Sequence, residues 1–196
     1  MLLCVDPSQA ETDLVGGALS CPHQGCGGVL GPWGHARWRR TRVAPGNVDA
    51  HRPRRARCRS CQRSQVLVWA RSYPRRADAV EVVGTALLKA TQGQGHRQIA
   101  AKLGVPATTV RDWLRRARRN AEPVRTDATA ALIALDPNPA TINPTGSALG
   151  DMLNAVGLAI AAALRRFGSQ PAPWQLGVVL TRAAILSPRA HPPQVR

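Results

Sequence analysis

The sequence predicts an α+β protein built from three small modules: a Cys4 zinc ribbon in the N-terminal part, a central helix-turn-helix and a helical C-terminal region. Two pairs of closely spaced cysteines predict the ribbon. An ordered set of apolar, small and glycine positions predicts the helix-turn-helix, and apolar residues at helical spacing predict the last module. A chain of 196 residues suits two to three such modules and is too short for a large enzyme core. We place the modules at 1–75, 76–122 and 126–196.

Two paired cysteine turns predict a structural zinc site. Four residues lie between Cys21 and Cys26, two residues lie between Cys58 and Cys61, and 31 residues lie between the pairs. A tetrahedral Zn²⁺ takes four thiolates from two such turns while the intervening chain forms a hairpin. The two glycines after Cys26 suit a turn in which backbone N–H groups approach the bound sulfurs. Because four thiolates leave no position open for water or substrate, we expect this metal to hold structure and not to perform catalysis.

Alternatives stay open for the cysteines. The spacing of Cys21 and Cys26 is wider than the commoner two residues, so the four thiols could instead be buried without a metal. His23 lies inside the first turn, where it could be a ligand or a bystander. A redox role for the pair at 58–61 would need a βαβ context that the sequence does not show. Cys4 stands apart, and we expect it to be a small buried apolar side chain.

Basic side chains are concentrated in the middle of the chain. The formal net charge is +16, from 27 Lys and Arg against 11 Asp and Glu. Residues 1–36 contain no basic side chain, residues 37–125 contain 22 of them, and residues 126–196 contain five. Arginine-rich codon usage would raise the arginine content throughout the chain, so it does not explain this step. A concentrated basic segment is typical of proteins that bind phosphate-rich partners, above all nucleic acids.

The predicted ribbon hairpin holds many of these basic side chains. Trp33 and Trp38 are interleaved with them, which makes the hairpin a candidate phosphate-contacting surface. The alternative is a solvated charged face. In either case we expect the two tryptophans to belong to a small core and not to stack on bases. The arginines concerned are Arg37, Arg39, Arg40, Arg42, Arg52, Arg54, Arg55, Arg57, Arg59 and Arg63.

The central module is expected to open with a helix near Asp78. Asp78 is a suitable N-cap, and the helix should end at the Gly93-Gln94-Gly95 break. Residues at three- and four-residue spacing would form its apolar face. These residues are Val80, Val83, Leu87 and Leu88.

Residues 96–116 carry the most specific pattern in the chain. Ala100 falls where two helices would cross closely and only a small side chain fits, and Gly104 falls where the turn between them needs a positive φ. Pro106 suits the first turn of the second helix, which should end near Asn120. The apolar positions that would hold the two helices together are Ile99, Leu103, Val105, Val110 and Trp113.

The second helix of this pair is the candidate recognition helix for the major groove of duplex DNA. Arg111 could donate two hydrogen bonds to guanine, and Asp112 could accept from cytosine or orient Arg111. The alternative, a helical hairpin that binds no nucleic acid, is disfavoured by the basic character of the helix. The candidate base-reading residues are Ala107, Thr108, Arg111, Asp112 and Arg115. The candidate phosphate-contacting residues are Arg97, Arg116, Arg118 and Arg119.

The C-terminal module is expected to contain helices near 127–135, 147–167 and 173–186. The middle one has an apolar stripe that must be buried, either inside a small helical domain or in a homodimer interface. We expect intramolecular packing and keep the dimer as an alternative. The stripe consists of Leu149, Met152, Leu153, Val156, Ile160, Leu164 and Phe167.

The sequence shows no targeting segment and predicts no membrane partner. The start, Met-Leu-Leu-Cys-Val-Asp-Pro, lacks the basic and apolar regions of a secretory signal. The longest uncharged apolar stretch in the C-terminal part, Ala155 to Leu164, is too short to cross a bilayer. We therefore expect a cytoplasmic protein, in whose reducing surroundings cysteines act as metal ligands or free thiols.

From Cys21 to about Arg119 the sequence resembles an uncharacterised bacterial family of zinc-ribbon plus helix-turn-helix proteins. It is also similar to the N-terminal DNA-binding part of some insertion-element transposases. The resemblance covers about half the chain and implies double-stranded DNA as the partner, but it does not choose between a regulator and a transposase. It rests on Cys-Pro…Cys-Gly-Gly at 21–28, Ala-Arg-Cys-Arg-Ser-Cys at 56–61 and Ile-Ala-Ala-Lys-Leu-Gly-Val-Pro…Thr-Val-Arg-Asp-Trp-Leu at 99–114.

No catalytic residue is predicted. Full transposases add a nuclease domain with metal-binding carboxylates, whereas the only acids after residue 125 are Asp127, Asp136 and Asp151. The sequence therefore predicts a non-enzymatic DNA-binding protein, either a transcriptional regulator or a transposase-derived protein. An RNA-binding or ribosome-associated ribbon protein is the alternative, and an enzyme fragment ranks third.

Overall fold

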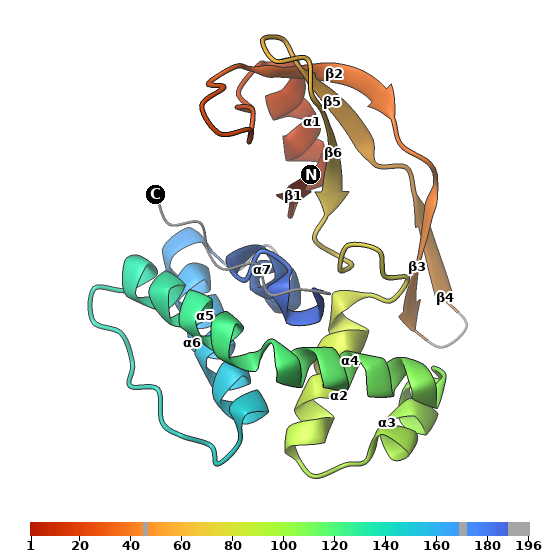
Figure 1. The fold of residues 1–196 in the computed structure, drawn as a ribbon, viewed down its shortest axis with the longest axis vertical. Helices are drawn as coiled ribbons and strands as arrows, with labels where there is room; N and C mark the ends of the chain where they lie inside the picture. The colour runs from red at the N-terminus through yellow and green to blue at the C-terminus, as the bar shows by residue number, and fades with distance from the viewer. Residues whose placement is uncertain (45–46, 169–171, 188–196) are drawn as a thin grey trace.

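The computed structural model describes residues 1–44, 47–168 and 172–187 and shows a mixed α+β protein (Figure 1). The strands lie at one end, together with one short helix, and the other helices form the opposite end. The first half contains β1 (Leu2–Cys4), α1 (Pro7–Val15), β2 (Leu30–His35), β3 (Arg39–Ala44), β4 (Asn47–His51), β5 (Arg54–Cys58) and β6 (Ser64–Trp69). The second half contains α2 (Val80–Thr91), α3 (His96–Leu103), α4 (Ala107–Arg119), α5 (Ala121–Leu135), α6 (Ala148–Phe167), α7 (Pro173–Leu180) and a 3₁₀ turn, η1 (Ala184–Leu186).

The N-terminal part, which we call the ribbon (residues 1–69), contains a four-stranded sheet of order β1-β6-β5-β2. β1 pairs in parallel with β6, and the other pairs are antiparallel. β6 covers a run rich in β-branched and apolar residues, Gln65 to Trp69, which is typical of a strand. α1 begins at Pro7 because Asp6 caps it, accepting hydrogen bonds from the backbone N–H groups of Ser8 and Gln9. Apolar side chains of α1 and of the sheet form a small core, which contains Ala10, Leu14, Leu30, Ala56 and Leu67 together with Cys21 and Cys58.

The chain between β2 and β5 forms a second, two-stranded unit, the β3–β4 hairpin. Arg39 is paired with His51 and Arg42 with Val48 in its antiparallel register. In Figure 1 this hairpin extends away from the sheet and reaches the side of the molecule where α2 and α3 lie.

The helix predicted at Asp78 exists as α2, but Asp78 does not cap it, so this part of the prediction is wrong. The N-cap is Ala79, which makes no side-chain cap hydrogen bond. The buried Asp78 carboxylate instead accepts a 2.8 Å hydrogen bond from Nε of Arg42 on β3. Leaving a buried carboxylate without a cation costs more free energy than leaving this helix without a side-chain cap. The cation is Arg42, which lies on a strand 36 residues earlier in the chain. Leu88, predicted on the buried face, is 45% exposed, whereas Val80, Val83 and Leu87 are buried.

The helices α2 to η1 share one apolar core, and we call residues 80–186 the helical body. α5 begins at Ala121, six residues before the predicted start at 127, and follows α4 directly. The buried amide of Asn120 holds this junction, because its Nδ2 donates to the carbonyls of Ala184, Ile185 and Ser187 at 2.9 to 3.2 Å. The predicted division between 76–122 and 126–196 falls inside α5, where buried side chains of both parts meet in one core.

α6 is the central helix of the C-terminal part and follows its N-cap Ser147, whose Oγ accepts a hydrogen bond from the N–H of Gly150 at 3.1 Å. Its predicted stripe is buried as far as Ile160, Leu164 packs at the edge of the core, and Phe167 is 68% exposed. The stripe packs on other helices of the same chain, which is the intramolecular alternative. The helix predicted at 173–186 is interrupted, because Arg182 and Ala183 adopt positive φ between α7 and η1.

α6 is also long and apolar enough to cross a membrane by length and composition alone. Its 20 residues have a mean hydropathy of 1.4 in the relevant window, half of which is buried inside the protein. The uncharged stretch from Ala155 to Leu164 is thus only part of a longer apolar helix. The burial of α6 nevertheless suits a core helix.

Candidate nucleic-acid interface and metal site

Four cysteine sulfurs meet at the outer end of the ribbon. Cys58 ends β5, Cys61 follows it in a tight turn, and Cys21 and Cys26 come from the loop before β2. All four Sγ atoms lie within 4.8 Å of one another, with Cys21 3.7 Å from Cys61 and Cys26 3.6 Å from Cys58. Four sulfurs at about 2.3 Å from one ion would lie roughly 3.8 Å apart, so the cluster has the size of a tetrahedral thiolate site. The four predicted ligands are thus within metal-binding distance.

The electrostatics of the cluster also suit a cation. The pKa of Cys58 is lowered to about 6, chiefly by a hydrogen bond from the backbone N–H of Cys61. Burial opposes this shift, and a second hydrogen bond, from the backbone N–H of Ser60, adds to it. The pKa of Cys21 rises to about 12, because burial and the neighbouring thiols outweigh the backbone N–H of His23, which lowers it. Four thiolates this close repel one another strongly unless a positive ion lies among them.

The turn geometry explains the glycines next to Cys26. Gly25 and Gly27 have φ of +72° and +59°, a region that favours glycine. A Cβ on Gly28 would lie 2.8 Å from Sγ of Cys58 and would displace it. His23 is not one of the four clustered groups, and its Nδ1 lies 3.1 Å from Nη1 of Arg63. Cys4 lies apart on β1, where burial raises the pKa of its thiol to about 11.

The helix-turn-helix is formed by α3 and α4 as predicted. Gly104 adopts φ 63° and ψ 33° at the end of α3, the left-handed conformation that the turn was expected to need. Ile99, Ala100, Val110 and Trp113 are buried, while Leu103 and Val105 are partly buried against the same core. Pro106 lies one position earlier than expected, as the N-cap of α4, where its lack of an N–H has no cost to the helix.

α4 presents a basic stripe to solvent. Its buried face is formed by Val110, Trp113, Leu114 and Ala117. The opposite face has exposed residues at three- and four-residue spacing, so their side chains line one edge of the helix. This α4 stripe consists of Thr108, Arg111, Arg115 and Arg118. Of the other predicted contact residues, Arg97 on α3 is exposed and Ala107, at the start of α4, is half-buried.

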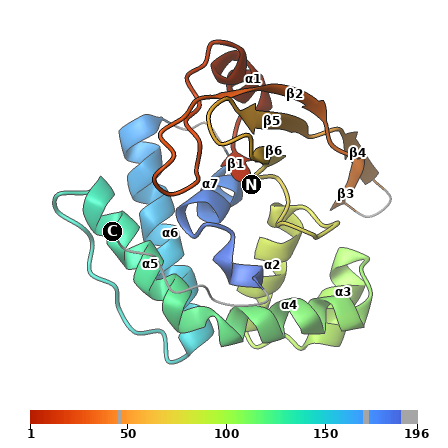
Figure 2. The same ribbon diagram turned by 45° about the horizontal axis from the view of Figure 1, so that its top comes forward.

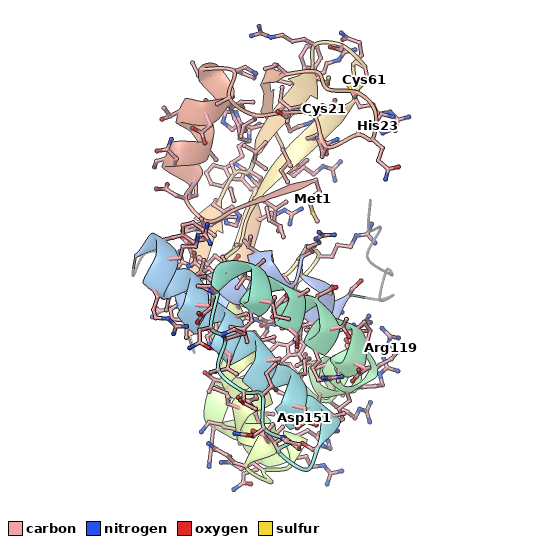
Figure 3. The ribbon with its side chains drawn as sticks, turned by 90° about the vertical axis from the view of Figure 1, so that its left-hand side faces the viewer. Met1, Cys21, His23, Cys61, Arg119 and Asp151 are labelled. Carbon is pink, nitrogen blue, oxygen red and sulfur yellow. The ribbon has the colours of Figure 1, made fainter. Side chains whose placement is uncertain are left out.

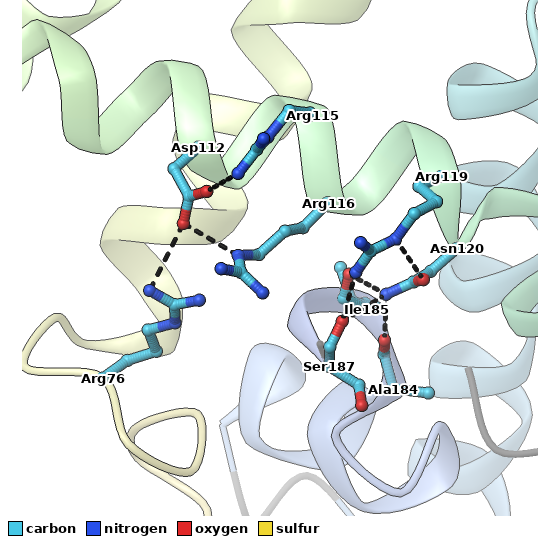
Figure 4. A network of polar contacts seen from close by, with 9 residues as sticks. All are labelled: Arg76, Asp112, Arg115, Arg116, Arg119, Asn120, Ala184, Ile185 and Ser187. Carbon is cyan, nitrogen blue, oxygen red and sulfur yellow. Dashed lines mark hydrogen bonds and ion pairs between the residues drawn. The ribbon is translucent and has the colours of Figure 1, made fainter. Parts of the chain in front are cut away.

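Asp112 is the centre of an ion-pair network beside the stripe (Figure 4). Its carboxylate accepts from Arg115 at 2.7 Å and from Arg116 at 2.8 Å, and it lies 3.4 Å from Nη1 of Arg76. Burial opposes ionisation, but the hydrogen bonds from Arg116 and Arg115 outweigh it and hold the pKa of Asp112 below its usual value. In the described part of the chain, Asp112 therefore orients Arg115 and Arg116, and not Arg111 as predicted.

Two of the predicted phosphate-contacting arginines are also fixed to the protein. Arg116 is half-buried against Asp112. Arg119 donates to the carbonyl of Ser187 at 3.0 Å and contacts Asn120 (Figure 4). Figure 3 shows Arg119 in the helical body, far from Cys21 and Cys61 at the ribbon end.

The expectation that Trp33 and Trp38 form a core is wrong. They are 49% and 66% exposed, and the guanidinium of Arg57 lies 4.5 Å from the ring centre of Trp33. The physical reason is that the small ribbon core forms between α1 and the sheet, whereas the C-terminal part of β2 and the following loop extend beyond that core. Sequence reasoning also missed Arg76, whose signal was its place in the basic run just before the helix-turn-helix.

A family model described as a homeodomain-like domain, found in DNA-binding regions of transposases, matches residues 77–125. The match covers α2, α3, α4 and the start of α5, and it supports DNA binding in general. It does not reach the cysteine cluster. No curated protein and no solved structure matched the chain.

Proposed function

We propose that this protein binds duplex DNA sequence-specifically through α4, as a cytoplasmic transcriptional regulator or a transposase-derived DNA-binding protein. The observation that supports this most directly is the exposed α4 stripe, which lies on the third helix of the homeodomain-like unit and the second helix of the helix-turn-helix. A helix with a solvated basic edge and a buried apolar face can enter the major groove while its apolar face stays packed on the neighbouring helices.

Within this proposal the predicted contact residues take different roles. Arg111 and Arg115 reach base edges, with Thr108 and the methyl group of Ala107 at the entering end of α4. Arg97 and Arg118, both exposed, contact phosphates. The remaining predicted residues hold the interface in place through their intramolecular bonds, and these are Asp112, Arg116 and Arg119.

We also propose that the four clustered cysteines bind Zn²⁺ as a structural metal. A set of four thiolates in a reducing compartment favours zinc, and the closed arrangement gives the ion no reacting position. The ion would hold the two cysteine turns together at the outer end of the ribbon, where β5 ends and β2 begins.

Selection of bound duplexes from a random pool tests the proposed function. The wild-type protein should enrich one motif, and its binding should weaken steeply with salt. Arg111→Ala should lose preference at one base pair, at a cost of about 1–3 kcal/mol. Arg97→Ala, the matched control, should weaken binding to all sequences alike. Recovery of no motif, or equal loss of preference in both variants, would contradict the proposal.

The exposure of Trp33 and Trp38 favours one second candidate, binding of RNA by the ribbon. Exposed aromatic rings among arginines suit unpaired bases, which stack on such rings. If structured or single-stranded RNA displaces the selected duplex at equal concentration, this candidate replaces the first.

A further inference from the structure

We propose that the β3–β4 hairpin is a second DNA-binding arm, which contacts the sugar-phosphate backbone of the same duplex beside α4. This inference rests on the proposed function, because it assigns a further contact to the partner of α4. It is carried by three features of the hairpin: its attachment to the helix-turn-helix, its position and the charge of its outer face.

The hairpin is attached directly to the start of α2. The N–H of Arg42 donates to the carbonyl of Ala77 at 2.6 Å, and the carbonyl of Arg42 accepts from Ala79 at 2.9 Å. The Arg42 guanidinium also pairs with the buried Asp78 carboxylate at 2.7 Å. The outer edge of β3 is thereby bonded to the residues that lead into the first helix of the homeodomain-like unit, so the two move together.

The same connecting segment reaches the recognition helix. Arg76 pairs with Asp112 of α4, one residue before the segment pairs with β3. In Figures 1 and 2 the hairpin lies on the same side of the molecule as α3 and the N-terminal end of α4. A duplex bound at that end of α4 would therefore have the hairpin beside it.

The two faces of the hairpin differ in charge and burial. Thr41 is 1% exposed, and the inner-face acid, Asp49, pairs with Arg71. His51 packs edge to face on Trp69, with ring centres 6.0 Å apart. These contacts turn the alternate positions outward, where Arg40 lies opposite Ala50 and Arg42 opposite Val48.

The outward face is suited to phosphates. Arg40 and Arg52 are exposed, and Nε of Arg52 donates to the carbonyl of Ala36 at 3.1 Å, which holds its guanidinium at the surface. Trp38, 66% exposed, precedes Arg39 at the entry to β3 and offers a flat apolar surface to a deoxyribose. Among the described hairpin residues Asp49 is the only acid, and it faces inward. A face on which every described charged side chain is an arginine complements a DNA backbone, and no unpaired base is needed.

The test compares two double variants of the full chain. Arg40→Gln with Arg52→Gln removes the two outward charges of the arm other than Arg42, whose guanidinium is already paired with Asp78. The control, Arg165→Gln with Arg166→Gln, removes the same charge from exposed positions at the far end of α6. Affinity for the selected duplex is measured from 50 to 300 mM salt, after circular dichroism and metal content show that both variants are folded.

We expect the hairpin variant to lower the slope of log affinity against log salt by about 2, since each phosphate contact contributes about 0.9. It should bind about tenfold or more weakly near 0.15 M salt, with unchanged sequence preference. Hydroxyl-radical footprints should lose one protected backbone segment and keep the segment at the groove read by α4.

The outcomes separate the two proposals. A wild-type protein that selects no duplex ends the proposed function itself. A wild-type protein that binds its duplex with the same slope and footprint as the hairpin variant overturns the arm alone. Loss of single-stranded binding in the hairpin variant, with duplex binding intact, also overturns it, because the arm would then serve a different partner.

Discussion

The ribbon and the helical body obtain their stability in different ways. The ribbon core consists of a few small or medium side chains, and two of the four clustered cysteines are part of it. The helical body has a continuous apolar core that includes Trp113, Leu87, Met152 and Ile185, and none of the described residues buried in that core is a cysteine or a histidine. With so little buried apolar area, the ribbon would depend on the proposed Zn²⁺ for its folding, whereas the helical body can fold on its packing. The four experiments below test this contrast, beginning with the largest expected effect.

Loss of the metal should separate the two regions. Cys58→Ser, or treatment with a strong chelator, is expected to unfold the ribbon, because the binding energy of a structural zinc is about 10–16 kcal/mol in small zinc modules. The helical signal from α2 to α6 should remain in far-ultraviolet circular dichroism, while amide protection in β5 and β6 is lost in hydrogen exchange. Cys4→Ser, a thiol outside the cluster, is the control and should change neither signal. Simultaneous melting of the helices would mean that the two regions form one cooperative unit.

Overpacking should affect the helical body alone. A Cβ on Gly84 of α2 would overlap the indole of Trp174 on α7. Gly84→Ala is therefore expected to destabilise the protein by about 1–3 kcal/mol in urea titration, without changing its metal affinity. Gly157→Ala on α6 has open space around the added methyl and should stabilise by about 0.5–1 kcal/mol. Equal effects of the two substitutions would show that α2 and α7 do not pack closely.

The Asp112 network should give the helical body a defined pH dependence. The folded-state pKa of Asp112 is lowered, so its contribution is present above the unfolded pKa of about 3.9 and is lost as the pH falls through the lower folded value. Asp112→Asn should cost about 1 kcal/mol at pH 7, and the cost should shrink as the pH falls below the unfolded pKa, measured by urea unfolding. Asp127→Asn on α5 removes the same charge elsewhere, and its effect on the unfolding free energy should not show this pH dependence. A cost of Asp112→Asn that does not shrink at acidic pH would argue against the ion pairs as its cause.

The junction between the regions contains a polar group that should reduce stability slightly. Tyr73 is 1% exposed, its hydroxyl has no hydrogen-bond partner among the described residues, and burial raises the pKa of the phenol. Tyr73→Phe is expected to raise the unfolding free energy by up to about 1 kcal/mol, because it removes an unsatisfied polar atom and keeps the ring. Tyr73→Leu, which also removes ring volume, should lower it. A loss of stability in Tyr73→Phe would instead indicate a buried water bound to the hydroxyl.

Features that depend on neighbouring residues could be predicted from sequence. The left-handed turn at Gly104, the strand at 64–69 and the span of α6 follow from local backbone preference and from the spacing of apolar residues. The cysteine cluster is a contact between distant segments, yet it was predictable because few residue types bind metals and their spacing is restricted. The early start of α5 was missed because its amphipathic pattern is weak, and buried partners stabilise its first turn.

By itself, the sequence determined the order of the elements, the set of four cysteines that cluster and the helix that presents a basic edge, because each of these is encoded within short segments. Only the tertiary structure decided that Asp78 holds Arg42, that Asp112 orients Arg115 and Arg116, and that two tryptophans face solvent. The reason is physical: a charged or aromatic side chain takes the partner or the exposure that packing offers, and packing depends on segments that are distant in the chain.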